Sequence, residues 1–204
     1  MPLEIEVKYL DADHAALRER LAALGAARLG RWFESNIVFD DDCRSLKARG
    51  TLLRLRGHKG RHVLTLKRAA SAKITGETSG KVKVYEESET DVSAPEALQE
   101  ILAGLGLLPA LRYEKFREVW ALLGCEVCLD TLPFGDFAEI EGDEADIRAC
   151  AEALNLPEHK ASCATYHDLN RQACAARGAR PDESFVFTAE HKARLLPEPG
   201  PEPK

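Results

Sequence analysis

The sequence predicts an α+β fold: an eight-stranded antiparallel β-barrel with flanking helices. Short segments in which apolar and polar residues alternate recur along most of the 204-residue chain, as half-buried strands require. Gly, Ser, Asp or Pro stands at most of the breaks between these segments, so short turns rather than crossover helices join them. Eight strands are enough to close a barrel, which removes the exposed sheet edges.

The predicted strands all show alternation or a β-rich composition between turn residues. They span residues 3–9, 33–40, 51–57, 61–68, 81–90, 113–122, 126–131 and 136–141.

Helices are expected between some of the strands. Asp11 or Asp13 can cap a first helix that ends at Gly25. Its apolar stripe consists of Leu17, Leu21 and Leu24. A second helix, at residues 95–105, is expected to open at Ser93 and stop near Gly106, and two more are expected at residues 145–154 and 166–177.

The chain is expected to form one main domain with a C-terminal extension. Residues 1–178 make the barrel domain, and residues 179–204 follow it. Within the extension, residues 185–196 are compatible with a docking helix, whereas residues 197–204 are rich in Pro and Glu and are expected to be disordered.

Composition narrows the functional classes. The formal net charge of −6 argues against binding to duplex nucleic acid, which usually needs a basic face. No apolar run is long enough to cross a bilayer, and the N-terminus lacks the features of a signal peptide, so we expect a cytoplasmic protein that does not bind membranes. We leave open whether two copies of the chain form a homodimer.

The six cysteines are expected to be reduced thiols. Cys125-x-x-Cys128 is half of a zinc or redox motif, but no second pair is present, and in a strand the two sulfurs would lie on opposite faces. We therefore favour packed thiols at these two positions.

Charged residues share one face of several predicted strands. In the first strand, Glu4, Glu6 and Lys8 lie on one face, and apolar residues occupy the other. One such strand is most simply a half-exposed strand. The pattern recurs, however, at Arg54 and Arg56, Thr65 and Lys67, Lys115 and Arg117, and Glu139 and Glu141. We infer that acidic and basic strands line one lumen, where their mutual attraction offsets part of the cost of burial.

This set of charges suits a triphosphate and a metal ion. A triphosphate carries about four negative charges near neutral pH, and arginines can hold its oxygens bidentately. The carboxylates would repel it unless a cation intervened, and Mg²⁺ or Mn²⁺ accepts carboxylate and phosphate oxygens together. A metal between Glu4, Glu6 and Glu139 or Glu141 could then polarise the phosphoryl group.

The sequence resembles the CYTH superfamily, named for class IV adenylyl cyclases and thiamine triphosphatases. Glu4-x-Glu6-x-Lys8 is similar to the family's E-x-E-x-K motif at the N-terminus. The similarity extends over about residues 1 to 170, through segments that follow in the family's order: residues 36–40, 53–56, 64–67, 115–117 and 137–141.

The resemblance implies an eight-stranded triphosphate tunnel, a divalent metal (Mg²⁺ or Mn²⁺) and a substrate that ends in a triphosphate. It implies metal ligation by Glu4, Glu6, Glu87, Asp130, Glu139 and Glu141, with Glu4, Glu6, Lys8 and Glu139 as catalytic residues. It implies phosphate binding by Lys8, Arg54, Arg56, Lys67, Lys83, Lys115 and Arg117. Glu87 and Glu89 match the family's mid-chain acidic pair in one of several registers.

Two positions depart from the family pattern. Lys160 stands six residues before Tyr166, whereas many members carry a lysine just before a Ser-Tyr pair. Leu52 and Leu53, rather than an aromatic residue, precede Arg54, which disfavours thiamine triphosphate as the substrate.

Three functional hypotheses are compatible with this set of charged residues. We favour hydrolysis of inorganic or nucleoside triphosphate, with cyclisation of ATP by a class IV adenylyl cyclase as the alternative. A non-catalytic binder of polyphosphate or nucleotide is the third hypothesis, but such a protein need not keep the acidic residues.

Overall fold

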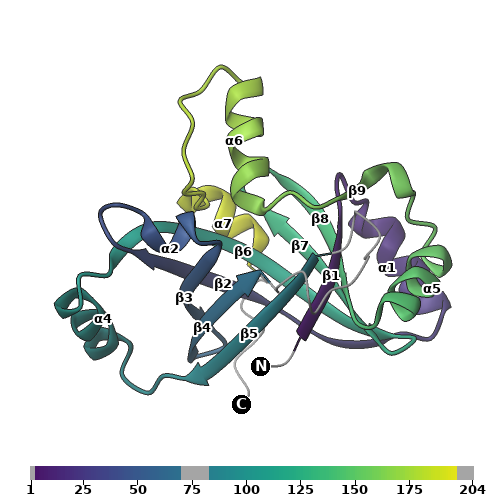
Figure 1. Ribbon diagram of the computed structural model, residues 1–204. Coiled ribbons are helices and arrows are strands. Elements are labelled where there is room, and N and C mark those ends of the chain that lie inside the picture. The colour runs from purple at the N-terminus through teal and green to yellow at the C-terminus, as the bar shows by residue number, and fades with distance from the viewer. Residues whose placement is uncertain (1–2, 70–82, 197–204) are drawn as a thin grey trace, which may run out of the picture.

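The computed structural model describes residues 3–69 and 83–196, and in this part of the chain eight antiparallel strands close into a barrel (Figure 1). The strands are β1 (Leu3–Tyr9), β2 (Ala27–Asp40), β3 (Thr51–His58), β4 (Arg61–Ala69), β5 (Lys83–Asp91), β6 (Leu108–Leu122), β7 (Cys125–Leu132) and β8 (Gly135–Glu141). Their order is β5-β4-β3-β2-β6-β7-β8-β1, and pairing of β5 with β1 closes the barrel. A short ninth strand, β9 (Ala161–Ser162), pairs with β1.

The eight predicted strands are present, but two of them begin much earlier than predicted, and β7 and β8 begin one residue earlier. β2 starts at Ala27 and β6 at Leu108, because these two strands pair along almost their whole length. Register shifts between Arg28 and Gly30 and between Val38 and Phe39 interrupt the alternation. Residues 81 and 82 of the predicted fifth strand, and the predicted tail at residues 197–204, lie outside the described residues.

The helices follow the prediction with small differences. They are α1 (His14–Ala23), α2 (Ser45–Ala48), α4 (Pro95–Gly104), α5 (Glu144–Ala153), the 3₁₀ helix η1 (Glu158–Lys160), α6 (Tyr166–Ala176) and α7 (Ala189–Leu195). The Asp13 side chain caps α1, accepting hydrogen bonds from the backbone N–H groups of Ala15 and Ala16. Leu24 lies at the end of α1 and is 39% exposed, so the prediction that it continues the buried stripe was wrong.

Two helix starts also differ from the prediction. The N-cap of α4 is Ala94 rather than Ser93, because Pro95 fixes the first helical position. α7 begins at Ala189, since Phe185 instead forms a β-bridge with Tyr113. The four-residue α2 was not predicted.

Much of the apolar core lies outside the barrel wall, beneath the helices, whereas a further cluster that includes Val38, Leu111 and Tyr113 lines part of the interior. α1 and α5 cover the outer face of β1, β7 and β8, where Leu21, Val127 and Ile140 are fully buried (Figure 1). α4 covers a smaller cluster around Phe39 and Leu55. The interior of the barrel is therefore free to carry charged residues.

The cysteines are free thiols, as expected. Cys125 packs in the outer core with Cys150, whereas Cys128 lies opposite Glu139 in the β7–β8 pair, on the inner face. None of the helices in the described part of the chain is long and apolar enough to cross a membrane.

Candidate functional site

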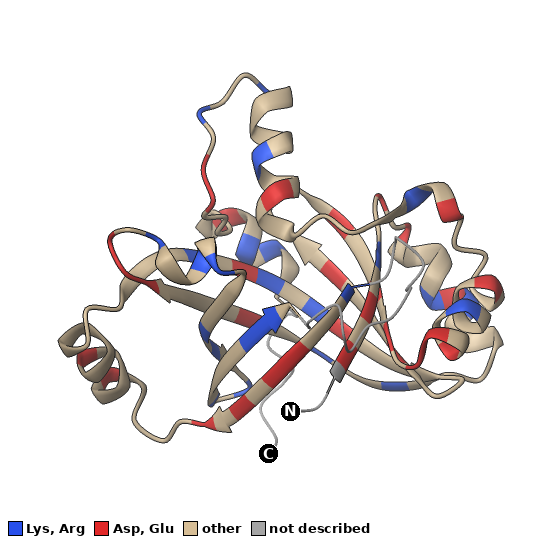
Figure 2. Ribbon diagram, in the orientation of Figure 1, with Lys and Arg blue, Asp and Glu red and all other residues tan. Residues whose placement is uncertain are grey.

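The barrel interior contains a cavity of about 470 Å³ whose wall is dominated by charged side chains. Figure 2 shows Lys and Arg as well as Asp and Glu on the strands of the barrel, with β5 largely acidic. The predicted residues that line the cavity are Glu4, Glu6 and Lys8 on β1, Arg54 and Arg56 on β3, Lys67 on β4, Lys83 on β5, Lys115 and Arg117 on β6, and Glu139 and Glu141 on β8. Two other predicted residues, Glu87 and Asp130, lie behind this lining.

Three carboxylates converge at the closure of the barrel. β1 pairs with β8 on one side and β5 on the other, so that Glu6 lies opposite both Glu141 and Lys83. Carboxylate oxygens of Glu4, Glu6 and Glu141 lie within 4.8 Å of one another. Burial raises the pKa of Glu141 to about 7, and the neighbouring carboxylates add to this effect against the charge of Arg117. A group of three converging carboxylates offers the hard oxygen donors that fit a Mg²⁺ or Mn²⁺ ion.

Glu139 is held by cations instead of joining this group. Its carboxylate accepts hydrogen bonds from Lys8 and Arg117, and all three side chains are at least nine-tenths buried. Burial opposes ionisation, but these cations outweigh it and hold the pKa of Glu139 well below its ordinary value. Lys8 and Glu139 are direct cross-strand partners, which explains their pairing.

Asp130 orients two of the predicted phosphate-binding residues. Arg117 donates to both of its oxygens, over 2.8 and 2.6 Å, and Lys115 donates over 3.0 Å. The hydroxyl of Tyr166, at the start of α6, also donates to Asp130 over 3.0 Å. Tyr166 lines the cavity and lies against Lys8, whose ammonium is 4.0 Å from the ring centroid. The sequence analysis did not assign Tyr166 to the site.

On the opposite wall, each cation forms ion pairs with one or more acidic residues. Lys67 donates to Glu4 over 2.7 Å and lies 3.3 Å from Glu87. Arg54 lies 3.7 Å from Glu87 and 3.6 Å from Glu89, and it donates to the hydroxyl oxygens of two neighbours, Thr65 and Tyr113. Lys83 donates to Glu6 over 3.4 Å. Apart from the Lys67–Glu4 contact, these ion pairs are long and leave the cations able to donate hydrogen bonds to phosphate oxygens.

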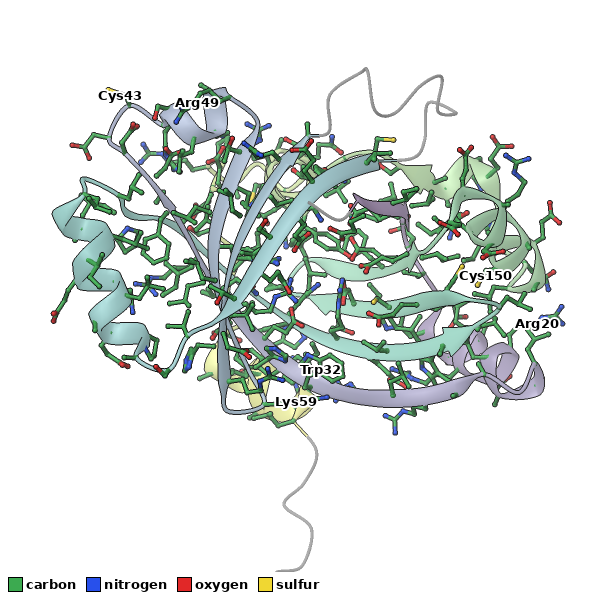
Figure 3. The ribbon with its side chains drawn as sticks, turned by 60° about the horizontal axis from the view of Figure 1, so that its bottom comes forward. Arg20, Trp32, Cys43, Arg49, Lys59 and Cys150 are labelled. Carbon is green, nitrogen blue, oxygen red and sulfur yellow. The ribbon has the colours of Figure 1, made fainter. Side chains whose placement is uncertain are left out.

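The sequence analysis missed a deeper polar layer on β2. Glu34 is 1% exposed, accepts a hydrogen bond from Trp32 Nε1 over 2.9 Å, and lies 3.7 Å from both Arg56 and Lys115. Trp32 in turn lies under the ammonium of Lys59, 3.6 Å from the ring centroid (Figure 3). Ser35 shares the outer face with Phe33, which obscured the alternation that would have identified Glu34.

Several buried atoms next to the cavity lack a hydrogen-bond partner among the described residues. They are Glu34 Oε2, Asn36 Oδ1 and Nδ2, Arg54 Nε and Arg56 Nε. Buried polar atoms are normally satisfied, so this set fits a polar ligand or ordered water in the barrel.

Lys160 points away from the site. Its ammonium donates to the backbone oxygen of Asp11 over 2.8 Å, and Lys160 is not among the residues that line the cavity. The departure from the family pattern noted in the sequence thus corresponds to a lysine outside the barrel.

Comparisons with known proteins agree with this architecture. The sequence model of the CYTH domain matches residues 2–162. A protein named "Putative adenylate cyclase" from Methanocaldococcus jannaschii is 27% identical over 146 residues, which are 71% of this chain and 79% of that protein.

Two solved structures share the fold. A "putative adenylate cyclase" from Vibrio parahaemolyticus has a TM-score of 0.67 at 22% identity, covering 80% of this chain and 95% of that one. A "putative adenylyl cyclase" from Hippeastrum, described as having a dominant triphosphatase activity, has a TM-score of 0.59 at 19% identity, covering 90% of this chain and 100% of that one.

Proposed function

The chain belongs to the CYTH domain family, and from that premise we propose that it is a metal-dependent enzyme that hydrolyses inorganic triphosphate or a nucleoside triphosphate inside its barrel. The observation that carries this proposal is that acidic and basic side chains occupy different parts of the cavity wall. Glu4, Glu6 and Glu141 converge on one side, and arginines and lysines line other parts of the same 470 Å³ cavity. A purely structural barrel would have no use for so many inward charges.

The cations supply a clamp for the phosphate chain. Asp130 holds Arg117 and Lys115 in fixed orientations, so these two residues can donate to a phosphate without first being ordered. Arg54 is paired only at 3.6 to 3.7 Å, and phosphate oxygens can replace its carboxylate partners with shorter contacts. The clamp also neutralises charge that develops on the leaving group.

Glu4, Glu6 and Glu141 would hold the Mg²⁺ or Mn²⁺ ion. When bound, such an ion polarises a phosphoryl oxygen as a Lewis acid. In hydrolysis, water attacks the terminal phosphorus, and the bond between this phosphorus and the bridging oxygen breaks. Inorganic triphosphate then yields orthophosphate and pyrophosphate, while the cations of the barrel retain the charged products.

A class IV adenylyl cyclase is the second candidate. The relative from M. jannaschii is named for that activity, and the cavity mouth has apolar and aromatic residues, including Leu52, Leu111 and Tyr113, beside which a nucleoside could lie. In this reaction the ribose 3′-hydroxyl attacks the α-phosphorus and pyrophosphate leaves. The two reactions share the clamp and differ in the nucleophile.

Product analysis distinguishes these functions. Purified protein is incubated with ATP or inorganic triphosphate plus Mg²⁺ or Mn²⁺, and cyclic AMP, pyrophosphate, ADP and orthophosphate are resolved. We expect orthophosphate without cyclic AMP. Cyclic AMP with pyrophosphate would establish the cyclase instead, and triphosphate binding without turnover would indicate a binding module.

A further inference from the structure

The mouth of the cavity carries a second group of cations, apart from the triphosphate clamp. Lys47 on α2 donates a hydrogen bond to the carboxylate of Glu183, and Arg44 and Arg171 lie 3.6 and 3.7 Å from the same carboxylate. Arg44, Lys47 and Glu183 line the same cavity as the clamp. Arg171 also pairs with Asp168 at 2.5 Å. Three cations and two carboxylates meet here, and Asp40 lines the same part of the cavity wall.

Lys47 on α2 and Arg44, the N-cap residue of α2, are held in place by contacts with β2 and β6. Asp40 accepts hydrogen bonds from the backbone N–H groups of Leu46 and Lys47, at 2.9 and 3.1 Å. The guanidinium of Arg44 donates to the backbone oxygen of Ala110 over 3.1 Å. These contacts fix the backbone of α2 and direct both side chains to the cavity mouth.

The backbone around Glu183 is held by hydrogen bonds from α6, whereas its side chain is held by the ion pairs with Arg44, Lys47 and Arg171. The ring of His167 donates to the backbone oxygen of Glu183 over 2.9 Å, and Asn170 donates to the backbone oxygen of Asp182 over 2.7 Å. Phe185 then bridges to Tyr113. Figure 1 shows this segment descending from α6 past α2 to α7. The segment lies beyond the residues 2–162 that the CYTH domain model matches.

The ion pairs at the mouth can be exchanged easily. The side chains of Arg44 and Lys47 are 39% and 53% exposed, and ion pairs that are open to solvent contribute little to stability. A phosphate group brings more charge than a carboxylate and offers oxygens that Arg can hold bidentately. A bound phosphate would therefore displace the Glu183 side chain without moving its backbone.

We propose that Arg44 and Lys47 form an outer phosphate subsite in which Glu183 serves as a displaceable counter-anion, and that this subsite extends the substrate range to linear polyphosphates of more than three phosphates. The inference rests on the proposed function, because the first three phosphates occupy the clamp. A volume of 470 Å³ is typical of sites for whole drug-sized molecules and leaves room for a longer chain. A neutral nucleoside would leave these ion pairs intact and gain nothing from the two cations.

Binding of chains of different length tests the subsite. Affinities for inorganic triphosphate and linear inorganic tetraphosphate are measured by calorimetry without added divalent cations, so that hydrolysis does not intervene. Glu183→Gln should strengthen tetraphosphate binding about tenfold more than triphosphate binding, since a charged hydrogen-bonding partner becomes available. Lys47→Gln should weaken tetraphosphate binding by a similar factor, and should cancel the effect of Glu183→Gln in the double variant.

Glu190→Gln is the matched control, because it removes the same charge from an exposed position of α7 in the same segment. Equal effects of Glu183→Gln on both chain lengths, or the same effect from Glu190→Gln, would overturn the subsite. If the wild-type protein bound triphosphate normally under those outcomes, the proposed function would stand and this inference alone would fail. If the wild-type protein bound neither chain, this inference would fail, and the proposed function would be decided separately by the product analysis with Mg²⁺ or Mn²⁺.

Discussion

At the scale of single residues, Glu6 tests the carboxylate group most directly. It lies between Glu4 and Glu141 and also pairs with Lys67 and Lys83, at 3.6 and 3.4 Å. Glu6→Gln keeps the shape but removes one charge, so we expect metal-dependent turnover to fall by about a hundredfold or more. Folding should change little, because removing one of several like charges relieves repulsion.

Steady-state turnover with Mn²⁺ and a thermal melt measure these two effects for Glu6→Gln. Glu19→Gln removes the same charge from an exposed position on α1 and should leave both unchanged. Full turnover in Glu6→Gln would show that Glu6 does not hold the metal.

Arg56 tests the phosphate clamp. It lines the cavity and its ion pair with Glu34 spans 3.7 Å, so its guanidinium is available to a ligand. Arg56→Ala should weaken the inhibition of nucleoside triphosphate turnover by inorganic triphosphate about tenfold or more. This is the usual effect of losing a charged hydrogen bond. Arg148→Ala, at an exposed position of α5, is the control. Unchanged inhibition in Arg56→Ala would remove this residue from the clamp.

Glu34 predicts a pH dependence of stability. Burial opposes its ionisation, but Lys115, Arg56 and Arg117 outweigh burial and lower the pKa of Glu34. A carboxylate whose pKa is depressed in the folded state contributes stability that is fully present above the unfolded value, about 4.3, and is lost as pH falls below it.

We therefore expect Glu34→Gln to lose less unfolding free energy between pH 6 and pH 3 than the wild-type protein does. Urea unfolding at each pH measures this difference, with Glu19→Gln as the control. Identical pH slopes in the wild-type protein and Glu34→Gln would contradict the assignment of Glu34 as a charged, paired carboxylate.

At the scale of secondary-structure elements, prediction succeeded where the sequence alternates regularly. β1, β3 and β8 show their charged and apolar faces directly, and the Asp13 cap marks the start of α1. α2 escaped prediction because four residues carry no helical period, and its start depends on hydrogen bonds that its backbone N–H groups donate to the carboxylates of Asp40 and Asp41. Tyr166 was placed at the start of a helix, but only the packing of α6 brings its hydroxyl to Asp130.

The segment before α7 makes a prediction at this scale. Phe185 is 4% exposed and packs against Tyr113 and Phe134, whereas its neighbour Val186 is 52% exposed. Phe185→Ala should lower the free energy of unfolding by about 3 kcal/mol through the lost burial and the cavity that remains. Val186→Ala, the matched control, should change it by less than about 0.5 kcal/mol. Equal effects in chemical denaturation would mean that the extension does not pack on the barrel.

At the scale of the whole molecule, closure of the barrel decides which charges meet. Alternation put both Glu139 and Glu141 on the inner face, and the sequence left open which of them joins Glu4 and Glu6. Pairing of β1 with β8 sets Lys8 opposite Glu139 and Glu6 opposite Glu141, so that one carboxylate is neutralised and the other joins the acidic group. Contacts between strands so far apart in sequence depend on register, which no local pattern encodes.

This coupling of closure and charge predicts that a metal ion stabilises the whole barrel. Glu4 and Glu6 belong to β1 and Glu141 to β8, so an ion held between them would join the two strands, and its binding free energy would add to that of folding. Thermal melts should show a higher Tm with Mn²⁺, reversed by a chelator, and the stabilisation should reach about 2.7 kcal/mol at a concentration 100 times Kd. Glu6→Gln should lose this shift but keep the separate shift caused by inorganic triphosphate, because the clamp residues remain. A Mn²⁺ shift of the same size in Glu6→Gln would place the ion elsewhere, and loss of both shifts would show that Glu6 supports the clamp rather than the metal.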